Sequence, residues 1–135
     1  MKSLLVKLGI LSIGLMILGY VEVWGEDWKR FGMNESGVFY YDAESITPPA
    51  KNTVRVWTKM VHSKESIRQA GKGLEDLLYS KRLWEINCAD KKIRRISKVA
   101  YSKDEKILIS DNKEEKFQNI NPKSLEQDLY EKVCK

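Results

Sequence analysis

The chain contains only two cysteines, Cys88 and Cys134, and both follow an apolar N-terminal segment that is typical of secretory signal peptides. Export would bring them into an oxidising compartment, where cysteines pair. A bond between them would close a loop of 46 residues (134 − 88). In the chain-entropy model, a loop of this length adds about 4 kcal/mol to the free energy of unfolding, a large share of a small domain's stability. The alternatives are two free buried thiols or a pair of metal ligands.

Residues 1–25 have the three parts of a signal peptide: a basic start, an apolar stretch and a small residue, Gly25, at the end. The uncharged stretch 8–21 has 14 residues (21 − 8 + 1), whereas a transmembrane helix needs about 20. We therefore predict cleavage after Gly25. The mature domain would be residues 26–135, exported to the periplasm or the outer cell envelope without a stable membrane span. The alternative is that the segment is retained as an N-terminal anchor.

The mature region alternates short β patterns with turn residues. Strands are expected at 28–33, 38–41, 54–61, 81–88, 93–101 and 107–109. This close spacing without helical crossovers predicts an antiparallel meander. In the strand 54–61, alternation places Val54, Val56, Thr58 and Met60 on one face. The segment 111–118 is highly charged, and we expect a solvated loop there.

Two segments have helical periodicity. The apolar stripe of the first predicts a central helix over 64–80; it consists of Ile67, Ala70, Leu74, Leu77 and Leu78. The second helix should begin at Asn121-Pro122, because proline is tolerated at the first helical position, and it aligns Leu125, Leu129 and Val133. It is short enough to be marginal alone and must pack on the sheet. The fold class is therefore α+β: an antiparallel sheet with one central helix and a C-terminal helix.

No sequence motif of a hydrolase, metalloprotease, P-loop or dinucleotide site is present. His62 is the only histidine, so a four-ligand zinc site cannot be assembled with it and two cysteines. The acidic residues from Asp111 onward lack the glycine turn of a calcium loop. We expect no metal, no cofactor and no enzyme activity. A small hydrolase that uses His62 and a carboxylate is the alternative from a different class, and a hydrogen bond between the two would identify it.

The predicted binding residues are Arg55, Trp57 and Lys59, which face away from the core side of their strand. An aromatic ring between two cations suits a partner with an acidic and apolar surface. The alternative is that the helix 64–80 covers this row. The mature chain has 22 basic and 18 acidic residues, a net charge of +4, and they are interspersed. This charge is modest, no base-stacking motif is present, and nucleic acid is not an expected partner.

Several segments resemble the surface-adhesin protein E family. They are Trp28, the run Val38–Asp42 with Ile46, Val54–Lys59, Glu85–Cys88, Tyr101 and Leu129–Lys135. The resemblance implies an antiparallel sheet with a C-terminal helix tethered by a disulfide, and a non-catalytic exported binding module. The family's namesake is an outer-membrane-associated adhesin that binds host matrix and plasma proteins. A protein partner or envelope component is therefore expected, and a homodimer is an open alternative. The competing function is a periplasmic structural or accessory protein.

Overall fold

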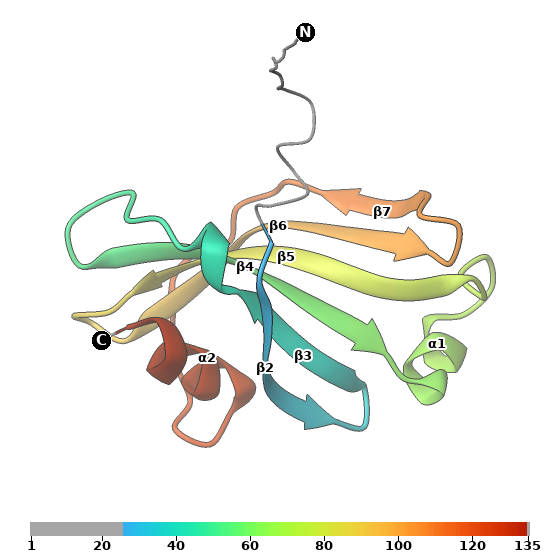
Figure 1. Cartoon of the computed structure of the whole chain (residues 1–135), viewed down its shortest axis with the longest axis horizontal. Coiled ribbons are helices and arrows are strands. Elements are labelled where there is room, and N and C mark those ends of the chain that lie inside the picture. The colour runs from blue at the N-terminus through green and yellow to red at the C-terminus, as the bar shows by residue number, and fades with distance from the viewer. Residues whose placement is uncertain (1–25, 135) are drawn as a thin grey trace, which may run out of the picture.

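The computed structural model describes residues 26–134, and its main element is one antiparallel sheet (Figure 1). The strands follow one another in the order β2-β3-β4-β5-β6-β7, and the short β8 pairs with β6. Their bounds are β2 Trp28–Asn34, β3 Gly37–Asp42, β4 Thr53–His62, β5 Leu77–Asn87, β6 Lys92–Ser102, β7 Ile107–Asp111 and β8 Gln118–Asn119. The predicted antiparallel meander is confirmed. The predicted signal peptide lies outside the described residues.

The first hairpin turns where the sequence predicts. Asn34 Oδ1 accepts a hydrogen bond of 2.8 Å from the N–H of Ser36, and Gly37 has a φ of +154°. A Cβ atom at Gly37 would collide with the carbonyl oxygen of Val61 on β4, so the close approach of the two strands requires glycine. The turn thereby brings the β2–β3 hairpin against β4.

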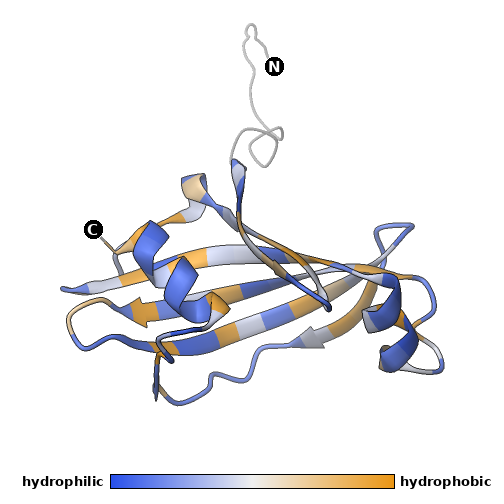
Figure 2. Cartoon of the chain, turned by 90° about the horizontal axis from the view of Figure 1, so that it is seen from below, coloured by the Kyte–Doolittle hydropathy of each residue, from blue (hydrophilic) through white to orange (hydrophobic). Residues whose placement is uncertain are grey.

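Alternation along β4 separates a core side from an open side. Val56, Thr58 and Met60 are 0%, 5% and 8% exposed, which confirms the predicted core-facing residues. The core cluster on this side consists of Tyr41, Val56, Ile86, Ile93, Ile120, Leu129 and Val133. Figure 2 shows the same alternation as hydrophobic and hydrophilic bands along the strands. We call the side with Val56 the inner face of the sheet and the opposite side the outer face.

The predicted central helix is much shorter than the stripe suggests. The helix α1 spans Lys64–Ala70 and ends at Gly71, which has a φ of +97°. Leu77, predicted to be helical, begins β5 and is 3% exposed. The prediction of helix over 71–80 is wrong because glycine favours the backbone that ends α1, and because pairing with β4 and β6 buries the next apolar residues in the sheet.

The C-terminal helix α2, Leu125–Val133, begins later than predicted. Its N-cap is Ser124, whose Oγ accepts a hydrogen bond of 3.2 Å from the N–H of Gln127. Leu129 and Val133 are buried in the core cluster. Cys134 follows the helix and is bonded to Cys88, with their Cα atoms 5.6 Å apart. The expected disulfide therefore ties the end of α2 to the sheet.

Charged residues between β7 and β8 are held against β6 by ion pairs. Arg95 lies 3.1 Å from Asp111 and 3.3 Å from Glu115, and Arg94 lies 3.4 Å from Glu114. The expected solvated loop is confirmed, since residues 112–117 are exposed and lie outside helices and strands, and the ion pairs with the arginines of β6 add to it. Within residues 26–134, no three potential metal-binding side chains gather at one point.

No helix in the part of the chain that the structure describes is long and apolar enough to cross a membrane.

Candidate functional site

The structure places Arg55, Trp57 and Lys59 on the outer face of β4. Each of the two cations has a partner within the domain. The Arg55 guanidinium lies 3.5 Å from the carboxylate of Glu85, which is 7% exposed. The Lys59 ammonium lies 4.7 Å from the centre of the Trp28 ring. The three residues therefore belong to a wider surface and do not form an isolated row.

Aromatic rings surround the Lys59 ammonium. Tyr79 and Tyr40 lie 5.5 Å and 6.0 Å from it, in addition to Trp28. Such distances are within the range of cation–π attraction. Burial, and secondly the charge of Lys81, lowers the pKa of Lys59, while Glu26 and Glu105 oppose the shift. The surface therefore holds a partly desolvated positive charge among electron-rich rings.

A second lysine extends this arrangement across the sheet. Lys81 Nζ lies 5.6 Å from the centre of Trp28 and 5.7 Å from that of Tyr101. Tyr101 stacks on Tyr79 with a centroid distance of 4.9 Å. Burial, with the neighbouring carboxylate of Glu105, raises the pKa of Tyr79 to about 12. We call the whole set the aromatic face: Trp28, Tyr40, Trp57, Lys59, Tyr79, Lys81 and Tyr101.

Strand register explains why these residues meet. Tyr40 pairs with Lys59, Lys59 with Lys81, and Tyr79 with Tyr101, so they share one side of the sheet. Trp28 comes from β2 at the sheet edge, and Figure 1 shows the start of that strand running across the front of the sheet. Glu26, just before β2, holds the start of this strand against the sheet, with its carboxylate 3.4 Å from Lys81 Nζ.

Both α-helices of the described chain lie on the inner side. Leu129 of α2 packs in the core cluster with Val56. Ser66 of α1 hydrogen-bonds to His62, which lies on the inner face because it follows Val56, Thr58 and Met60 at every second position of β4. The alternative that a 64–80 helix covers Trp57 is therefore wrong. Trp57 is half-buried, and neither α-helix of residues 26–134 lies above the aromatic face.

His62 links three elements, and its partners among residues 26–134 are two serines and no carboxylate. Its ring nitrogens lie 2.8 Å from Ser66 Oγ on α1 and 2.7 Å from Ser80 Oγ on β5. Burial, followed by the charges of Arg82 and Lys98, lowers the pKa of His62 to about 4. A ring with so low a pKa is a weak base at neutral pH, and Ser80 is only 1% exposed. The geometry favours a structural role and does not support the hydrolase alternative.

Part of the aromatic face was not foreseen from the sequence. Trp28, Tyr40 and Tyr101 were assigned to strands, but their register was unknown. Tyr79 lay in the predicted helix, so its side of the sheet could not be assigned. The available signal was the regular alternation of Tyr79, Lys81 and Leu83, which fits a strand better than a helix.

The architecture matches that of a known family of bacterial surface proteins. The family model for surface-adhesin protein E matches residues 28–135. The chain belongs to the surface-adhesin protein E family. Protein E of Haemophilus influenzae has a similar fold in several solved structures. Its selenomethionine form aligns with 79% of this chain and 84% of its own, with a TM-score of 0.57 and 13% identity.

A second crystal form of protein E aligns with 79% of this chain and 86% of its own, with a TM-score of 0.58 and 13% identity. At this identity the structural likeness establishes the fold alone. Among curated proteins, no sequence matches this chain. Membership of the surface-adhesin protein E family makes the chain an adhesin-like module of an exported surface protein.

Proposed function

We propose that this domain is a non-catalytic binding module whose protein partner docks on the aromatic face. The observation that carries the proposal is the gathering of aromatic rings and two lysines from five strands on one sheet face, which neither α-helix of residues 26–134 covers. Tryptophan and tyrosine are among the residue types that dominate binding energy at protein interfaces, and the two lysines add attraction for acidic groups. Family membership supports an adhesive role.

The chemistry of the face defines the complementary partner. Lys59 and Lys81 would attract acidic groups, and the rings of Trp57 and Tyr79 offer apolar contact. Lys59 is already partly desolvated, so a partner carboxylate beside it would face less competition from water. An acidic partner surface with exposed apolar side chains is therefore the best fit.

We further propose that residues 1–25 are removed on export and that the mature domain begins at Glu26. Contacts at the start of the described chain support this boundary. The N–H of Asp27 donates to Asp42 Oδ1 at 2.8 Å, and Glu26 is paired with Lys81. N-terminal sequencing of the exported protein should return Glu26. A protein that begins at Met1 in the membrane fraction would instead establish a retained anchor.

Photo-crosslinking tests the docking face without knowledge of the partner. A photoreactive phenylalanine analogue is placed at Tyr40 or Tyr79 in the full chain, expressed in its own host. A matched probe replaces Met33, which is 61% exposed and lies at the hairpin end of β2. We expect one recurrent adduct from the two aromatic-face positions and none from Met33. Adducts from Met33 alone would place the interface elsewhere, and no adduct from any position would contradict the proposal.

A further inference from the structure

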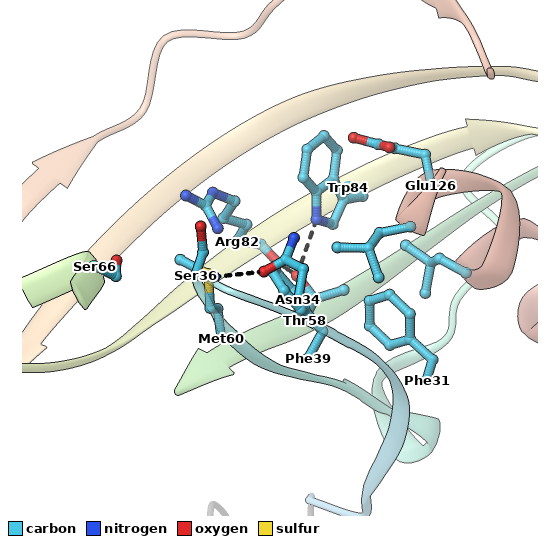
Figure 3. Close-up of a pocket in the computed structure, with 12 residues that line it drawn as sticks. Phe31, Asn34, Ser36, Phe39, Thr58, Met60, Ser66, Arg82, Trp84 and Glu126 are labelled. Carbon is cyan, nitrogen blue, oxygen red and sulfur yellow. Dashed lines mark hydrogen bonds between the residues drawn. The ribbon is translucent and has the colours of Figure 1, made fainter. Parts of the chain in front are cut away.

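A pocket of about 410 Å³ opens on the inner side of the sheet, remote from the aromatic face (Figure 3). It lies between the β2–β3 hairpin, the sheet and α2. One end is apolar, with Phe31, Phe39, Leu125 and Leu129 in its wall. The volume is within the range of natural small-molecule sites, about 300–1,000 Å³. The hairpin and the helix approach so closely that a Cβ atom at Gly32 would collide with Leu125.

The other end of the pocket is cationic. Arg82, on β5, lines the pocket and points into it near Ser36 and Met60 in Figure 3. Its guanidinium forms no ion pair or side-chain hydrogen bond with any residue in the range 26–134, and burial followed by the charge of Arg95 lowers its pKa. An arginine side chain carries five N–H donors, and two of them can bind one carboxylate side by side. Because Arg82 has no such partner among these residues, its donors that face the pocket lack a protein acceptor.

Neighbouring charges affect the positive potential at the Arg82 end of the pocket. Lys98 pairs with Arg82 across the strands and shares its side of the sheet, and burial followed by the charge of Arg82 lowers the pKa of Lys98. Arg95 is already neutralised by Asp111 and Glu115. Glu126 lines the pocket beside Trp84 in Figure 3, and its negative charge partly opposes the lowering of the Arg82 pKa. An anion would therefore be attracted to Arg82 and repelled from the Glu126 side.

We propose that this pocket binds a small amphipathic carboxylate, with its carboxylate on Arg82 and its hydrocarbon body against Phe31, Phe39 and Leu125. The bidentate pair would satisfy the guanidinium, and the hydrocarbon would replace water along the apolar wall. A neutral or cationic analogue would leave Arg82 without an acceptor. This site is independent of docking at the aromatic face.

Three probes of equal chain length separate charge from hydrophobicity: decanoate, decanol and decyltrimethylammonium, each below its micelle concentration. Binding to the mature domain, residues 26–135, is measured by titration calorimetry, and the site is located from amide chemical shifts. We expect decanoate to bind at least tenfold more tightly than either analogue, with the largest shifts at Gly32, Arg82 and Leu125. Equal affinity for decanoate and decanol, shifts on the outer face, or no binding of decanoate would overturn the proposal.

Variants of two arginines complete the test. Arg82→Gln should weaken decanoate binding at least tenfold and leave decanol binding unchanged, while Arg82→Lys should retain part of the decanoate affinity. Arg68→Gln is the matched control, since Arg68 lies on α1 with 72% of its side chain exposed. Thermal unfolding and amide spectra establish that each variant is folded before titration. Unchanged decanoate affinity in folded Arg82→Gln, or an equal loss in Arg68→Gln, would contradict the assignment.

Discussion

The same alternating strands form both faces of this sheet, but the two faces differ in their side chains and in how these are stabilised. The inner face buries aliphatic side chains under α2 and is tied by the Cys88–Cys134 bond. The outer face holds its rings and lysines half-buried by mutual contact. Burial of apolar surface stabilises the inner face, whereas cation–π contacts contribute about 0.5–2 kcal/mol each. Stability should therefore depend on the inner face, and recognition of a protein partner should depend on the outer face.

Removing the disulfide should have the largest effect on the inner face. We expect the double variant Cys88→Ser/Cys134→Ser to lose about 4 kcal/mol of unfolding free energy, because the unfolded chain regains the entropy of a 46-residue loop. Urea unfolding of the mature domain measures this loss. Reduction of the wild-type protein is the control and should give a similar decrease. A loss below about 1 kcal/mol would show that α2 docks without the bond.

Truncating the core residue of α2 should have the next largest effect. Leu129 is 2% exposed and belongs to the same core cluster as Val56 and Ile86. We expect Leu129→Ala to cost about 3 kcal/mol, through lost burial and the cavity left behind. The same urea experiment on Leu125→Ala is a matched control, because Leu125 is half-buried at the start of the helix. An equal loss in both variants would contradict the assigned core.

On the outer face, Trp57→Ala should separate binding from stability. We expect it to weaken binding to the crosslinked partner by about 2 kcal/mol, as truncation of an aromatic anchor does. The thermal midpoint should change little, because Trp57 lies outside the core cluster. The pair Arg55→Ala/Lys59→Ala should weaken binding chiefly at low salt. Unfolding of Trp57→Ala would assign Trp57 to the core, and unchanged affinity in a folded variant would exclude it from the interface.

The smallest effect concerns pH. The pKa of His62 is about 4 in the folded protein and near 6.5 in the unfolded chain, so the unfolded state binds more protons between these values. Stability from His62 is complete above pH 6.5 and falls as the pH drops towards 4. Because the ring is half-buried, we expect on the order of 1 kcal/mol or less at pH 5.

His62→Gln isolates this contribution, since His62 is the only histidine. Thermal midpoints of the wild type and the variant, compared from pH 7 to pH 5, should converge as the pH falls. A difference that is constant over this range would show that His62 does not titrate with unfolding.

The meander and its core side were predictable because both depend on local pattern. The period-two alternation in 54–61 assigned Val56, Thr58 and Met60 correctly, and turn residues marked the hairpins. The apolar stripe in 64–80 gave a wrong helix prediction for 71–80 because apolar spacing in short segments fits a helix and a strand equally well. Burial of Leu77 between neighbouring strands overrode the helical pattern.

By itself, the sequence determined the fold class, the cysteine pair and the family, because alternation, cysteine number and motif spacing are properties of the linear chain. Only the tertiary structure decided which rings meet on the aromatic face and that Arg82 enters a pocket without an acceptor. Strand register brings Tyr79 beside Tyr101, and the crossing of β2 brings Trp28 over Lys59 and Lys81. Such meetings depend on how strands far apart in the chain align, and no local interaction specifies that alignment.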